Sequence, residues 1–402
     1  MKPKSVMLIA GETSGDLLAA ELVHSLRDEL TAAEARPTTD YQPLRTSLEP
    51  RFFGAGGPRM AAEGVDLAFD MTVHSVIGIS DALKNVLKFK RLGRQLFELA
   101  RRRQPDAIIC VDFAGFNRRF AHAIKEYTRR RRDWFHDWRP KLIQYISPQV
   151  WASREGRAYQ MAKDYDLVLS IFPFEKEWYA KRVPKLRVEF VGHPILDRYQ
   201  RDGAPLTAKA GVSVLRIVVL PGSRRSELSR HLPVMLAGLE IIRATLPGLE
   251  ARLVLPNESM LQLAQALDLP TWLKSQVGEL PAALRDADVA IASTGTVTTE
   301  CAYFGVPTVA LYKTSWSTYH IGRRLVKVKY LAMPNLLANE EVFPEFIQQD
   351  ASPQNLAAAA IDLLQNVSRR AWVKAKLAEA VSSLGEPGAT RRAAQKIAEL
   401  LC

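Results

Sequence analysis

The residues Val6-Met7-Leu8-Ile9-Ala10-Gly11-Glu12-Thr13-Ser14-Gly15-Asp16 combine a short apolar run with a glycine-containing turn and the start of a helical pattern. An unbroken apolar run of this length is typical of a strand that is covered on both faces of a parallel sheet. The run is too short for a signal peptide, and no plausible cleavage site follows it. We therefore predict a buried first strand that leads directly into a helix.

Short apolar runs of the same kind recur along the chain, and helical patterns separate most of them, which predicts parallel α/β units. A break in composition at residues 198–214 predicts a boundary between two α/β domains of similar size. We place these domains at residues 1–197 and 212–375, followed by a C-terminal helical segment at 376–402. The predicted strands are residues 6–10, 107–111, 142–146, 167–171, 216–220, 251–255, 289–292 and 308–311.

The composition is that of an ordinary globular protein. Hydrophobic residues make up 47% of the 402 residues and charged residues 24%, which excludes a largely disordered chain and a small disulfide scaffold. Three cysteines, an odd number, favour a reducing compartment. No apolar run approaches the roughly 18 residues of a membrane-spanning helix. We therefore expect a cytoplasmic protein.

The chain carries 55 Lys and Arg against 43 Asp and Glu, a formal charge of +12, and dense basic clusters lie in its first half. In residues 76–99, apolar residues recur at helical spacing with cations between them, which predicts a basic amphipathic helix. Such a helix can dock on an anionic membrane or pack one face into the core, and the sequence favours neither. No nucleic-acid-binding module is recognisable, so we expect no nucleic-acid partner and interpret the run 129–132 as a solvated loop. The docking candidates are Lys88, Lys90, Arg91 and Arg94.

Two strand-end loops of the first domain carry candidate catalytic residues. Asp112 directly follows the strand predicted at 107–111, where a carboxylate can accept a proton from a substrate hydroxyl. The alternative is that Asp112 caps the next helix. In the first loop, Gly11 and Gly15 permit a tight turn and close approach to a ligand, while Ser14 or Asp16 could cap the helix that follows. A capped strand-to-helix turn is the simpler explanation of that loop.

Two strand-end loops of the second domain fit a nucleotide. In Pro221-Gly222-Ser223-Arg224, the glycine permits close backbone approach and Arg224 offers a planar cation for phosphate oxygens. In Ser293-Thr294-Gly295-Thr296, small residues expose backbone N–H groups at a helix start, and Glu300 could accept hydrogen bonds from a ribose diol. We find no metal-ligand spacing and no nucleophile motif, so we expect neither a metal nor another cofactor.

Together these loops and several further motifs resemble the lipid-A-disaccharide synthases, a glycosyltransferase family of bacterial outer-membrane lipid biosynthesis. The matching motifs occur in the family's order and span residues 5 to 365. Besides the opening motif, they are Gly54-Ala55-Gly56-Gly57-Pro58-Arg59-Met60, Tyr145-Ile146-Ser147-Pro148-Gln149-Val150-Trp151-Ala152, Phe172-Pro173-Phe174-Glu175-Lys176, Val191-Gly192-His193-Pro194, Leu220-Pro221-Gly222-Ser223-Arg224, Arg324-Leu325-Val326-Lys327 and Met333-Pro334-Asn335-Leu336-Leu337-Ala338-Asn339-Glu340.

The resemblance implies an α/β architecture of the GT-B type, in which two Rossmann-like, doubly wound domains face a central cleft, with the last helix crossing back to the first domain. It implies a UDP-2,3-diacylglucosamine donor and a 2,3-diacylglucosamine 1-phosphate acceptor, lipid X. The product would be the β-1,6-linked lipid A disaccharide 1-phosphate, formed with inversion and release of UDP. Because both substrates carry acyl chains, we expect peripheral association with the cytoplasmic face of the inner membrane. Whether the chain forms a homodimer stays open.

The resemblance also implies roles for individual residues. Asp112 would be the general base for the acceptor 6-hydroxyl, and Glu12 would position the acceptor or support that base. Arg224 would neutralise the diphosphate as charge develops on the leaving group. Asn335 aligns with a further active-site asparagine. The residues expected to bind UDP or substrate are Gly222, Ser223, Arg224, Ser293, Gly295, Thr296, Glu300 and Asn335.

The chain departs from the family pattern at a few places. Gly115 stands where better-known members carry a second aspartate, and Thr294 replaces a smaller or apolar residue in the nucleotide loop. The segments 31–50 and 129–138 are not typical of the family.

Two other functions stay open on the sequence. One is a different GT-B enzyme that transfers from UDP-N-acetylglucosamine to a lipid-linked peptidoglycan precursor. The other is a non-catalytic relative that binds membrane or RNA. A binding module need not keep the whole polar set at the strand ends, which argues against the second. That set is Glu12, Asp112, Arg224, Glu300 and Asn335.

Overall fold

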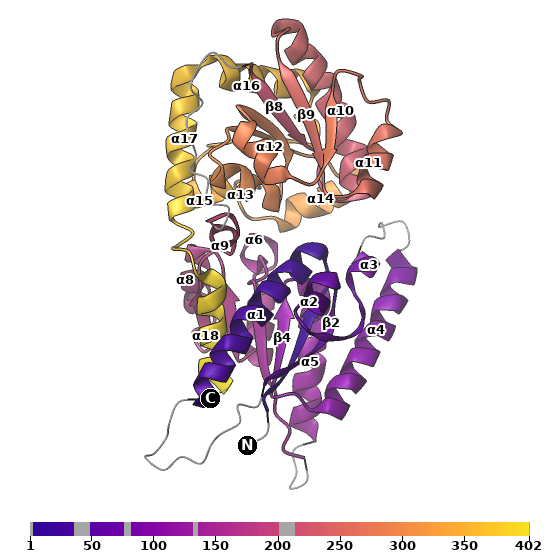
Figure 1. The fold of residues 1–402 in the computed structure, drawn as a ribbon, viewed down its shortest axis with the longest axis vertical. Coiled ribbons are helices and arrows are strands. Elements are labelled where there is room, and N and C mark those ends of the chain that lie inside the picture. The colour runs from indigo at the N-terminus through magenta and orange to yellow at the C-terminus, as the bar shows by residue number, and fades with distance from the viewer. Residues whose placement is uncertain (1–2, 36–48, 76–81, 132–135, 201–213, 402) are drawn as a thin grey trace. The chain divides into compact units, whose positions relative to one another are not determined.

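A computed structural model describes residues 3–35, 49–75, 82–131, 136–200 and 214–401 (Figure 1). The chain divides into two compact units, each built around its own sheet. The first unit comprises Met1–Asp197 and Gly385–Cys402, and the second comprises Arg198–Leu384. None of the helices in the described ranges is long and apolar enough to cross a membrane.

The first unit holds a seven-stranded parallel sheet in the order β3-β2-β1-β4-β5-β6-β7. The strand order reverses between β1 and β4, and open α/β sheets bind ligands outside the carboxyl ends of the strands at such a point. The strands are β1 (Ser5–Ala10), β2 (Arg51–Gly56), β3 (Asp66–Asp70), β4 (Ala107–Val111), β5 (Lys141–Tyr145), β6 (Leu167–Ser170) and β7 (Val188–Phe190). The helices are α1 (Thr13–Ala35), α2 (Pro58–Ala62), α3 (Thr72–Ser75), α4 (Ala82–Arg103), α5 (Ala114–Arg130), α6 (Val150–Ser153), α7 (Arg157–Asp164), α8 (Pro173–Arg182) and α18 (Ala389–Leu401). The helix α9 (Ile195–Gln200) crosses the boundary at Asp197, so its residues from Arg198 on belong to the second unit.

The second unit holds a six-stranded parallel sheet in the order β10-β9-β8-β11-β12-β13. Here the order reverses between β8 and β11, which pair with Leu220 opposite Ala292. The strands are β8 (Arg216–Leu220), β9 (Glu250–Leu255), β10 (Lys274–Val277), β11 (Val289–Ser293), β12 (Thr308–Tyr312) and β13 (Glu345–Ile347). The helices are α10 (Arg225–Thr245), α11 (Glu258–Gln265), α12 (Leu280–Asp286), α13 (Thr296–Tyr303), α14 (Trp316–Leu325), α15 (Met333–Ala338), α16 (Pro353–Gln365) and α17 (Val367–Ser382).

Every apolar run that we predicted as a strand forms one, with ends within one residue of the prediction. Five further strands escaped prediction: β2, β3, β7, β10 and β13. Four of them, β3, β7, β10 and β13, lie at sheet edges. The strands β3 and β10 carry polar residues, while β7 and β13 have three residues each. A continuous apolar run marks only a strand that is covered on both faces, so edge strands do not show it.

Two predicted segments need correction. The basic helix α4 runs over Ala82–Arg103, and residues 76–81 lie outside the described ranges. The basic run that we interpreted as a loop is partly helical, because Arg129 and Arg130 form the last turn of α5. The segment 31–50, which is not typical of the family, begins within α1, which extends to Ala35, and its residues 36–48 lie outside the described ranges.

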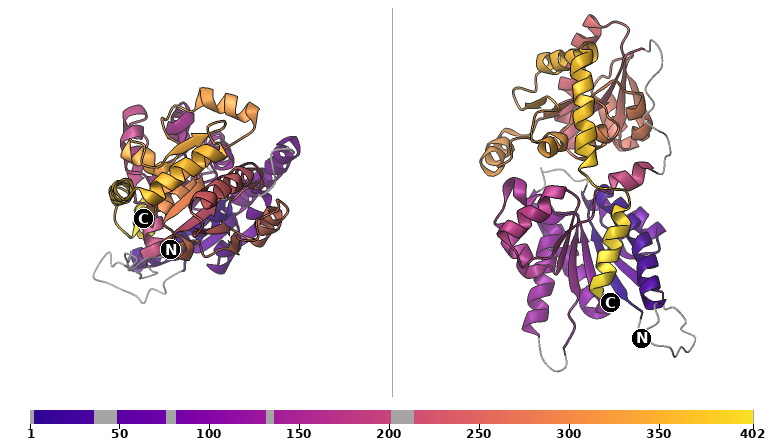
Figure 2. Two further views of the ribbon diagram at one scale, coloured as in Figure 1. Left: turned by 90° about the horizontal axis from the view of Figure 1, so that it is seen from above. Right: turned by 90° about the vertical axis from the view of Figure 1, so that its left-hand side faces the viewer.

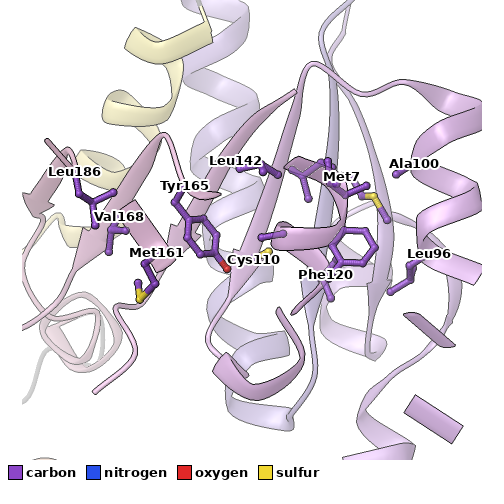
Figure 3. Close-up of a cluster of buried hydrophobic side chains, with 14 of the residues drawn as sticks. Met7, Leu96, Ala100, Cys110, Phe120, Leu142, Met161, Tyr165, Val168 and Leu186 are labelled. Atoms are coloured by element: carbon purple, nitrogen blue, oxygen red, sulfur yellow. The ribbon is translucent and has the colours of Figure 1, made fainter. Parts of the chain in front are cut away.

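The core of the first unit consists of side chains from both faces of its central strands. Figure 3 shows Met7 from β1, Cys110 from β4, Leu142 from β5 and Phe120 from α5 in one cluster, and all four are buried. Burial raises the pKa of the Cys110 thiol to about 12, and does the same for Cys301 in the second unit. Neither thiol is therefore ionised at neutral pH, and neither is a candidate nucleophile.

The helix α18 packs against α1 and completes the first unit (Figure 1). The Asp197 carboxylate accepts hydrogen bonds from the backbone N–H groups of Gly388, Ala389 at 3.2 Å and Thr390 at 2.9 Å. A carboxylate at these first N–H groups satisfies donors that have no partner within the helix. Asp197, the last residue of the segment Met1–Asp197, thereby holds the start of α18 in the first unit.

Candidate active site

The loops after β1 and β4 lie side by side at the carboxyl edge of the first sheet, because Ala10 pairs with Val111. A Cβ atom at Gly15 would lie 4.0 Å from the Cβ of Asp112, so the start of α1 reaches the loop that carries this aspartate. The structure thus brings the Glu12 loop and Asp112 to one place at the carboxyl edge of the sheet.

Asp112 adopts a strained backbone conformation. Its φ is 46° and that of Phe113 is 43°, both in the left-handed region that costs a non-glycine residue about 1–3 kcal/mol. The N-cap of α5 is Phe113, so Asp112 does not take the capping position that was the alternative. Two consecutive strained residues at a strand end persist only where surrounding contacts hold them, and such strain is concentrated at functional sites.

Two buried amides hold the Asp112 backbone in place. Its carbonyl oxygen accepts hydrogen bonds from Asn117 Nδ2 at 2.9 Å and from Gln144 Nε2 at 3.3 Å, while its N–H donates to the Tyr145 carbonyl at 3.0 Å. Asn117 and Gln144 are at most 1% exposed. Our sequence analysis missed both. Gln144 had a detectable signal, since it is a polar residue within an apolar strand.

The glycine at the end of β1 is required by an aromatic contact. A Cβ atom at Gly11 would lie 2.2 Å from a carbon of the Phe113 ring, so any other residue would displace this ring. Phe113 also packs against Phe89 of α4, with ring centroids 5.8 Å apart. By contrast, a Cβ at Gly115 would meet nothing within 4 Å, so packing does not require a glycine at this position.

Asp16 has a different role from the one that we expected. It lies inside α1, is 1% exposed, and accepts hydrogen bonds from the backbone N–H groups at the start of α2. The donors are Gly57 at 2.7 Å, Arg59 at 3.0 Å and Met60 at 3.1 Å. Asp16 therefore caps α2 and joins the first two family motifs, while Ser14, the other predicted cap, also lies within α1.

Glu175 is a buried carboxyl that links two further family motifs. Its Oε1 accepts a hydrogen bond from Trp151 Nε1 at 2.9 Å, and its Oε2 accepts one from the Phe172 N–H at 3.3 Å. Burial raises the pKa of Glu175 to about 7, and the hydrogen bonds from Trp151 and Phe172 oppose this rise only in part. The group is therefore half-protonated near neutral pH.

Glu175 should make the first unit less stable as pH rises. The pKa of Glu175 is about 7 in the folded chain against 4.5 ordinarily, so the unfolded chain releases the proton first. The contribution of Glu175 to the free energy of unfolding is complete below about pH 4.5. It falls by roughly 3 kcal/mol as the pH rises to about 7. Glu175→Gln cannot ionise, so its stability relative to the wild type should improve by about 2–3 kcal/mol between pH 5 and pH 8. Urea unfolding at both pH values, followed by tryptophan fluorescence, measures this. An equal difference at both pH values would contradict the assignment.

In the second unit, the loops after β8 and β11 meet in the same way. Gly222 has a φ of 112°, and a Cβ there would lie 3.1 Å from Ser293 Oγ and 2.5 Å from Glu227 Oε2. Glycine is thus required at position 222 by both its conformation and its neighbours. Ser293 is 3% exposed, and its hydroxyl lies against the Gly222 turn.

Glu227 shapes the loop that we predicted for a diphosphate, and our sequence analysis missed it. Its Oε2 accepts hydrogen bonds from the backbone N–H groups of Ser223 at 3.1 Å and Arg224 at 3.3 Å. Its Oε1 accepts one from Arg224 Nη1 at 3.1 Å, and the Arg224 side chain is 62% exposed. Glu227 is the third residue of α10 and reaches back to the N-cap, the spacing of a capping box. That spacing was readable in the sequence.

The start of α13 offers backbone donors without a side chain over them. Gly295 is the N-cap, with a φ of 151° and no side-chain cap, and a Cβ at this position would meet nothing within 4 Å. Gly295 and Thr296 are exposed. Thr298 Oγ1 donates to the Gly295 carbonyl at 2.7 Å and closes the first turn. An anion can therefore approach the N–H groups of this eight-residue helix.

Glu300 already accepts a hydrogen bond within the protein. Tyr199 Oη donates to its Oε1 at 2.7 Å. Burial raises the pKa of Glu300, while Tyr199 and Arg198 oppose that rise. A ribose diol at this position would share the carboxylate with Tyr199, a partner from α9 that the sequence did not indicate.

Asn335 is placed differently from a substrate ligand. It is 0% exposed, and its Oδ1 accepts from the backbone N–H groups of Val342 at 2.9 Å and Phe343 at 2.7 Å. Its Nδ2 donates to the Phe343 carbonyl at 2.8 Å and to Glu345 Oε1 at 2.7 Å. All of its hydrogen-bonding groups are thus used inside the second unit, so Asn335 positions this region and has no surface to offer a substrate.

The docking candidates lie on α4, which packs one face into the core. Leu92 and Leu96 are buried, whereas Lys90, Arg91 and Arg94 are exposed and Lys88 is half-buried. The packing alternative is therefore correct for one face, and the cations lie on the remaining surface together with Leu87, which is 65% exposed. Within the described ranges, no cluster of His, Cys, Asp or Glu could hold a metal ion.

Comparison with known proteins extends these observations. A family model described as lipid-A-disaccharide synthetase matches residues 6–400. A lipid-A-disaccharide synthase of Trichlorobacter lovleyi is 34% identical, over 98% of this chain and 96% of the relative. Among solved structures, the glycotransferase of kitacinnamycin matches with a TM-score of 0.60 at 18% identity, over 100% of both chains. A UDP-GlcNAc 2-epimerase from Neisseria meningitidis, bound to UDP-GlcNAc, matches with a TM-score of 0.59 at 10% identity, over 99% of this chain and 100% of that chain. At this identity the structures show the fold alone, and they confirm the GT-B class.

Proposed function

Because the chain belongs to the lipid-A-disaccharide synthetase family, we propose that it joins UDP-2,3-diacylglucosamine to lipid X and releases UDP. Family membership makes it a glycosyltransferase of lipid A biosynthesis with the GT-B fold. The observation that supports the proposed chemistry best is the Asp112 carboxylate on strained backbone at the end of β4, beside the Glu12 loop.

In the proposed reaction, Asp112 accepts the proton of the acceptor 6-hydroxyl as its oxygen attacks the anomeric carbon of the donor. The new carbon–oxygen bond forms on the face opposite UDP, the anomeric carbon–phosphate oxygen bond breaks, and the electron pair leaves with UDP. A single displacement turns an α-linked donor into a β-1,6-linked product. Glu12 positions the acceptor hydroxyl or supports Asp112.

The second unit would bind the leaving group. We propose that Arg224 and the N–H groups of Gly222 and Ser223 bind the diphosphate, together with Ser293 and the α13 start at Gly295 and Thr296. Positive charge and oriented donors at this position stabilise the charge that develops on UDP. Glu300 would accept hydrogen bonds from the ribose. Asn335 contributes by positioning, as its burial requires.

The reaction itself is tested with purified protein and the two acylated substrates in detergent micelles. Formation of a disaccharide 1-phosphate with a β-linkage, identified by mass spectrometry and NMR, supports the proposal. The rival assignment predicts turnover of UDP-N-acetylglucosamine with a lipid-linked peptidoglycan precursor and none with the acylated donor. That result would overturn the proposed substrates and leave the fold and family unchanged.

Glu227 should weaken UDP binding by pairing with Arg224. Glu227→Gln keeps an oxygen for the backbone N–H groups but removes the charge, so Arg224 is released toward the diphosphate. We expect UDP to bind about two- to fivefold more tightly, the range of an ion pair whose arginine is exposed. Glu227→Ala, the control, removes the backbone acceptor too and should bind UDP more weakly. Calorimetric titration with UDP measures both, and unchanged affinity in both variants would contradict the role of Glu227.

The acyl chains of both substrates require work at a membrane surface. We propose that the exposed cations of α4 attach the first unit to anionic lipid at the cytoplasmic face of the inner membrane. Changing Lys88, Lys90, Arg91 and Arg94 to Glu should lower flotation with phosphatidylglycerol vesicles at least tenfold, because about 1 kcal/mol is gained per cation near such a surface. Unchanged flotation would contradict this docking site.

A further inference from the structure

The helix α14 in the second unit has an unusual surface. It follows β12 and contains no buried residue. Trp316 is 75% exposed, the highest value among the large apolar side chains of the described ranges, and Ile321 is 61% exposed. Val326, just after the helix, is also exposed. Figure 2 shows this orange helix at the edge of its own domain. Apolar side chains exposed together in this way mark an interaction surface.

Along the chain, the segment that contains α14 has an excess of positive charge. Residues 301–339 contain five Lys or Arg and no Asp or Glu. Arg323 and Arg324 lie in the last turn of the helix and are exposed, as are Lys327 and Lys329 just beyond it. A surface that combines exposed apolar residues with a local excess of positive charge fits an anionic partner.

Aromatic rings and a cation share one face of the helix. Trp316, His320 and Arg323 are spaced at i, i+4 and i+7, which places them on the same side. The ring centroids of Trp316 and His320 are 4.1 Å apart, and those of Tyr319 and His320 are 5.4 Å apart. Tryptophan and tyrosine beside arginine are typical of the boundary between lipid headgroups and acyl chains. There the polar end of the ring contacts water while its apolar part contacts lipid.

A hollow beside the helix extends the positive surface. Its volume is about 440 Å³, and Trp316 forms part of its wall. Two of the other lining residues are cations, Arg230 and Lys313. Lys313 Nζ is held by the carbonyl oxygens of Gln348 at 2.8 Å and Ala351 at 3.3 Å, so its charge is fixed at this place.

From these observations we propose that α14 is a membrane-contacting surface of the second unit, and that its partner is the headgroup region of an anionic bilayer. A second protein chain fits less well. A helix of ten residues is about 15 Å long, too short to bury the roughly 800 Å² per partner of a stable protein interface. A bilayer needs no matching pocket, only insertion of Trp316 and Ile321 between headgroups that the arginines attract. The inference does not depend on which sugars the enzyme joins.

Vesicle flotation without any substrate tests the surface in the full-length protein. Arg323→Glu with Arg324→Glu should lower partition onto phosphatidylglycerol vesicles at least tenfold, and Trp316→Ser with Ile321→Ser several-fold. The first effect should fade at high salt and the second should persist. Two control variants should float like the wild type. They are Lys185→Glu with Lys374→Glu, which changes net charge equally, and Val367→Ser, which removes a valine that is 67% exposed.

A second measurement locates the contact. Brominated phosphatidylglycerol quenches tryptophans that enter the bilayer, and Trp316→Phe should remove part of the quenching seen in the wild type while the protein stays folded. Flotation and quenching equal to the wild type in the α14 variants would overturn the proposal. So would a change from dimer to monomer, seen by light scattering in the α14 variants at unchanged lipid partition, because the surface would then join two copies of the chain.

Discussion

Replacing Asp112 by Asn should lower kcat by about 10²- to 10⁴-fold, the contribution of a positioned general base, while KM for the donor changes little. Asparagine has nearly the same shape and tolerates the left-handed backbone that Asp112 adopts at a φ of 46°. The buried amides of Asn117 and Gln144 can still hold the carbonyl of residue 112. The variant therefore removes the proton acceptor and leaves the loop intact, so the loss should appear in kcat.

Separate measurement of kcat and of the donor KM distinguishes a base from a positioning group. A base predicts a loss confined to kcat in Asp112→Asn, whereas a residue that only positions substrate predicts a rise in KM as well. Asp350→Asn is a matched control, because Asp350 is an exposed aspartate in the second unit. A variant with wild-type kcat would reduce Asp112 to a structural residue.

The strain at Asp112 gives a further readout. Asp112→Gly also removes the carboxylate, but glycine adopts a positive φ without a steric penalty. We expect this variant to be inactive and more stable. Relief of backbone strain contributes about 1 kcal/mol to the free energy of unfolding, and the greater conformational entropy of glycine in the unfolded chain offsets part of this gain. Inactivity together with gained stability is the pattern of a residue held in a strained conformation for function. Urea unfolding of the first unit measures the stability change.

Much of the fold could be predicted from single segments. The strand β4 was predicted with both ends correct, because Ala-Ile-Ile-Cys-Val is buried on both faces and its apolar run stands out from its neighbours. The edge strand β10, Lys-Ser-Gln-Val, has no such run, since much of it faces solvent. What defines β10 is its parallel pairing with β9, which its own sequence does not indicate. An edge strand is therefore identified from its pairing with a neighbouring strand, because its own residue pattern does not distinguish it.

The candidate site divides in the same way. Gly222, Arg224 and Asp112 follow buried strands, so their places could be predicted from the strand ends. The partners that hold them could be predicted only where the spacing is local. Glu227 lies three residues after Arg224 and could have been found as a capping box. Tyr199 lies 101 residues from Glu300, and no local pattern connects the two.

The role of Asn335 could not be predicted from its motif alone, because it depends on the hydrogen bonds of the buried side chain. Replacing it by Ala should destabilise the second unit by about 3–5 kcal/mol, because two buried backbone N–H groups and a Glu345 oxygen lose their partner together. Glu345 also holds the start of α15 through the N–H groups of Leu331 and Ala332, at 2.8 Å each. Loss of Asn335 therefore loosens α15, which packs on the α13 helix that starts the proposed nucleotide site.

Stability and affinity together separate the two roles of Asn335. A positioning residue predicts a large loss of unfolding free energy in urea, with UDP affinity reduced only as far as the second unit is loosened. A substrate ligand predicts the reverse: normal stability and weak binding. Asn355→Ala is the matched control, because Asn355 is exposed and donates a single side-chain hydrogen bond, to the Asp350 carbonyl at 2.9 Å. It should cost less than about 1 kcal/mol. If Asn335→Ala were as stable as this control and failed to bind substrate, the asparagine would have to leave its buried position during the reaction, and its present hydrogen bonds would describe a resting state.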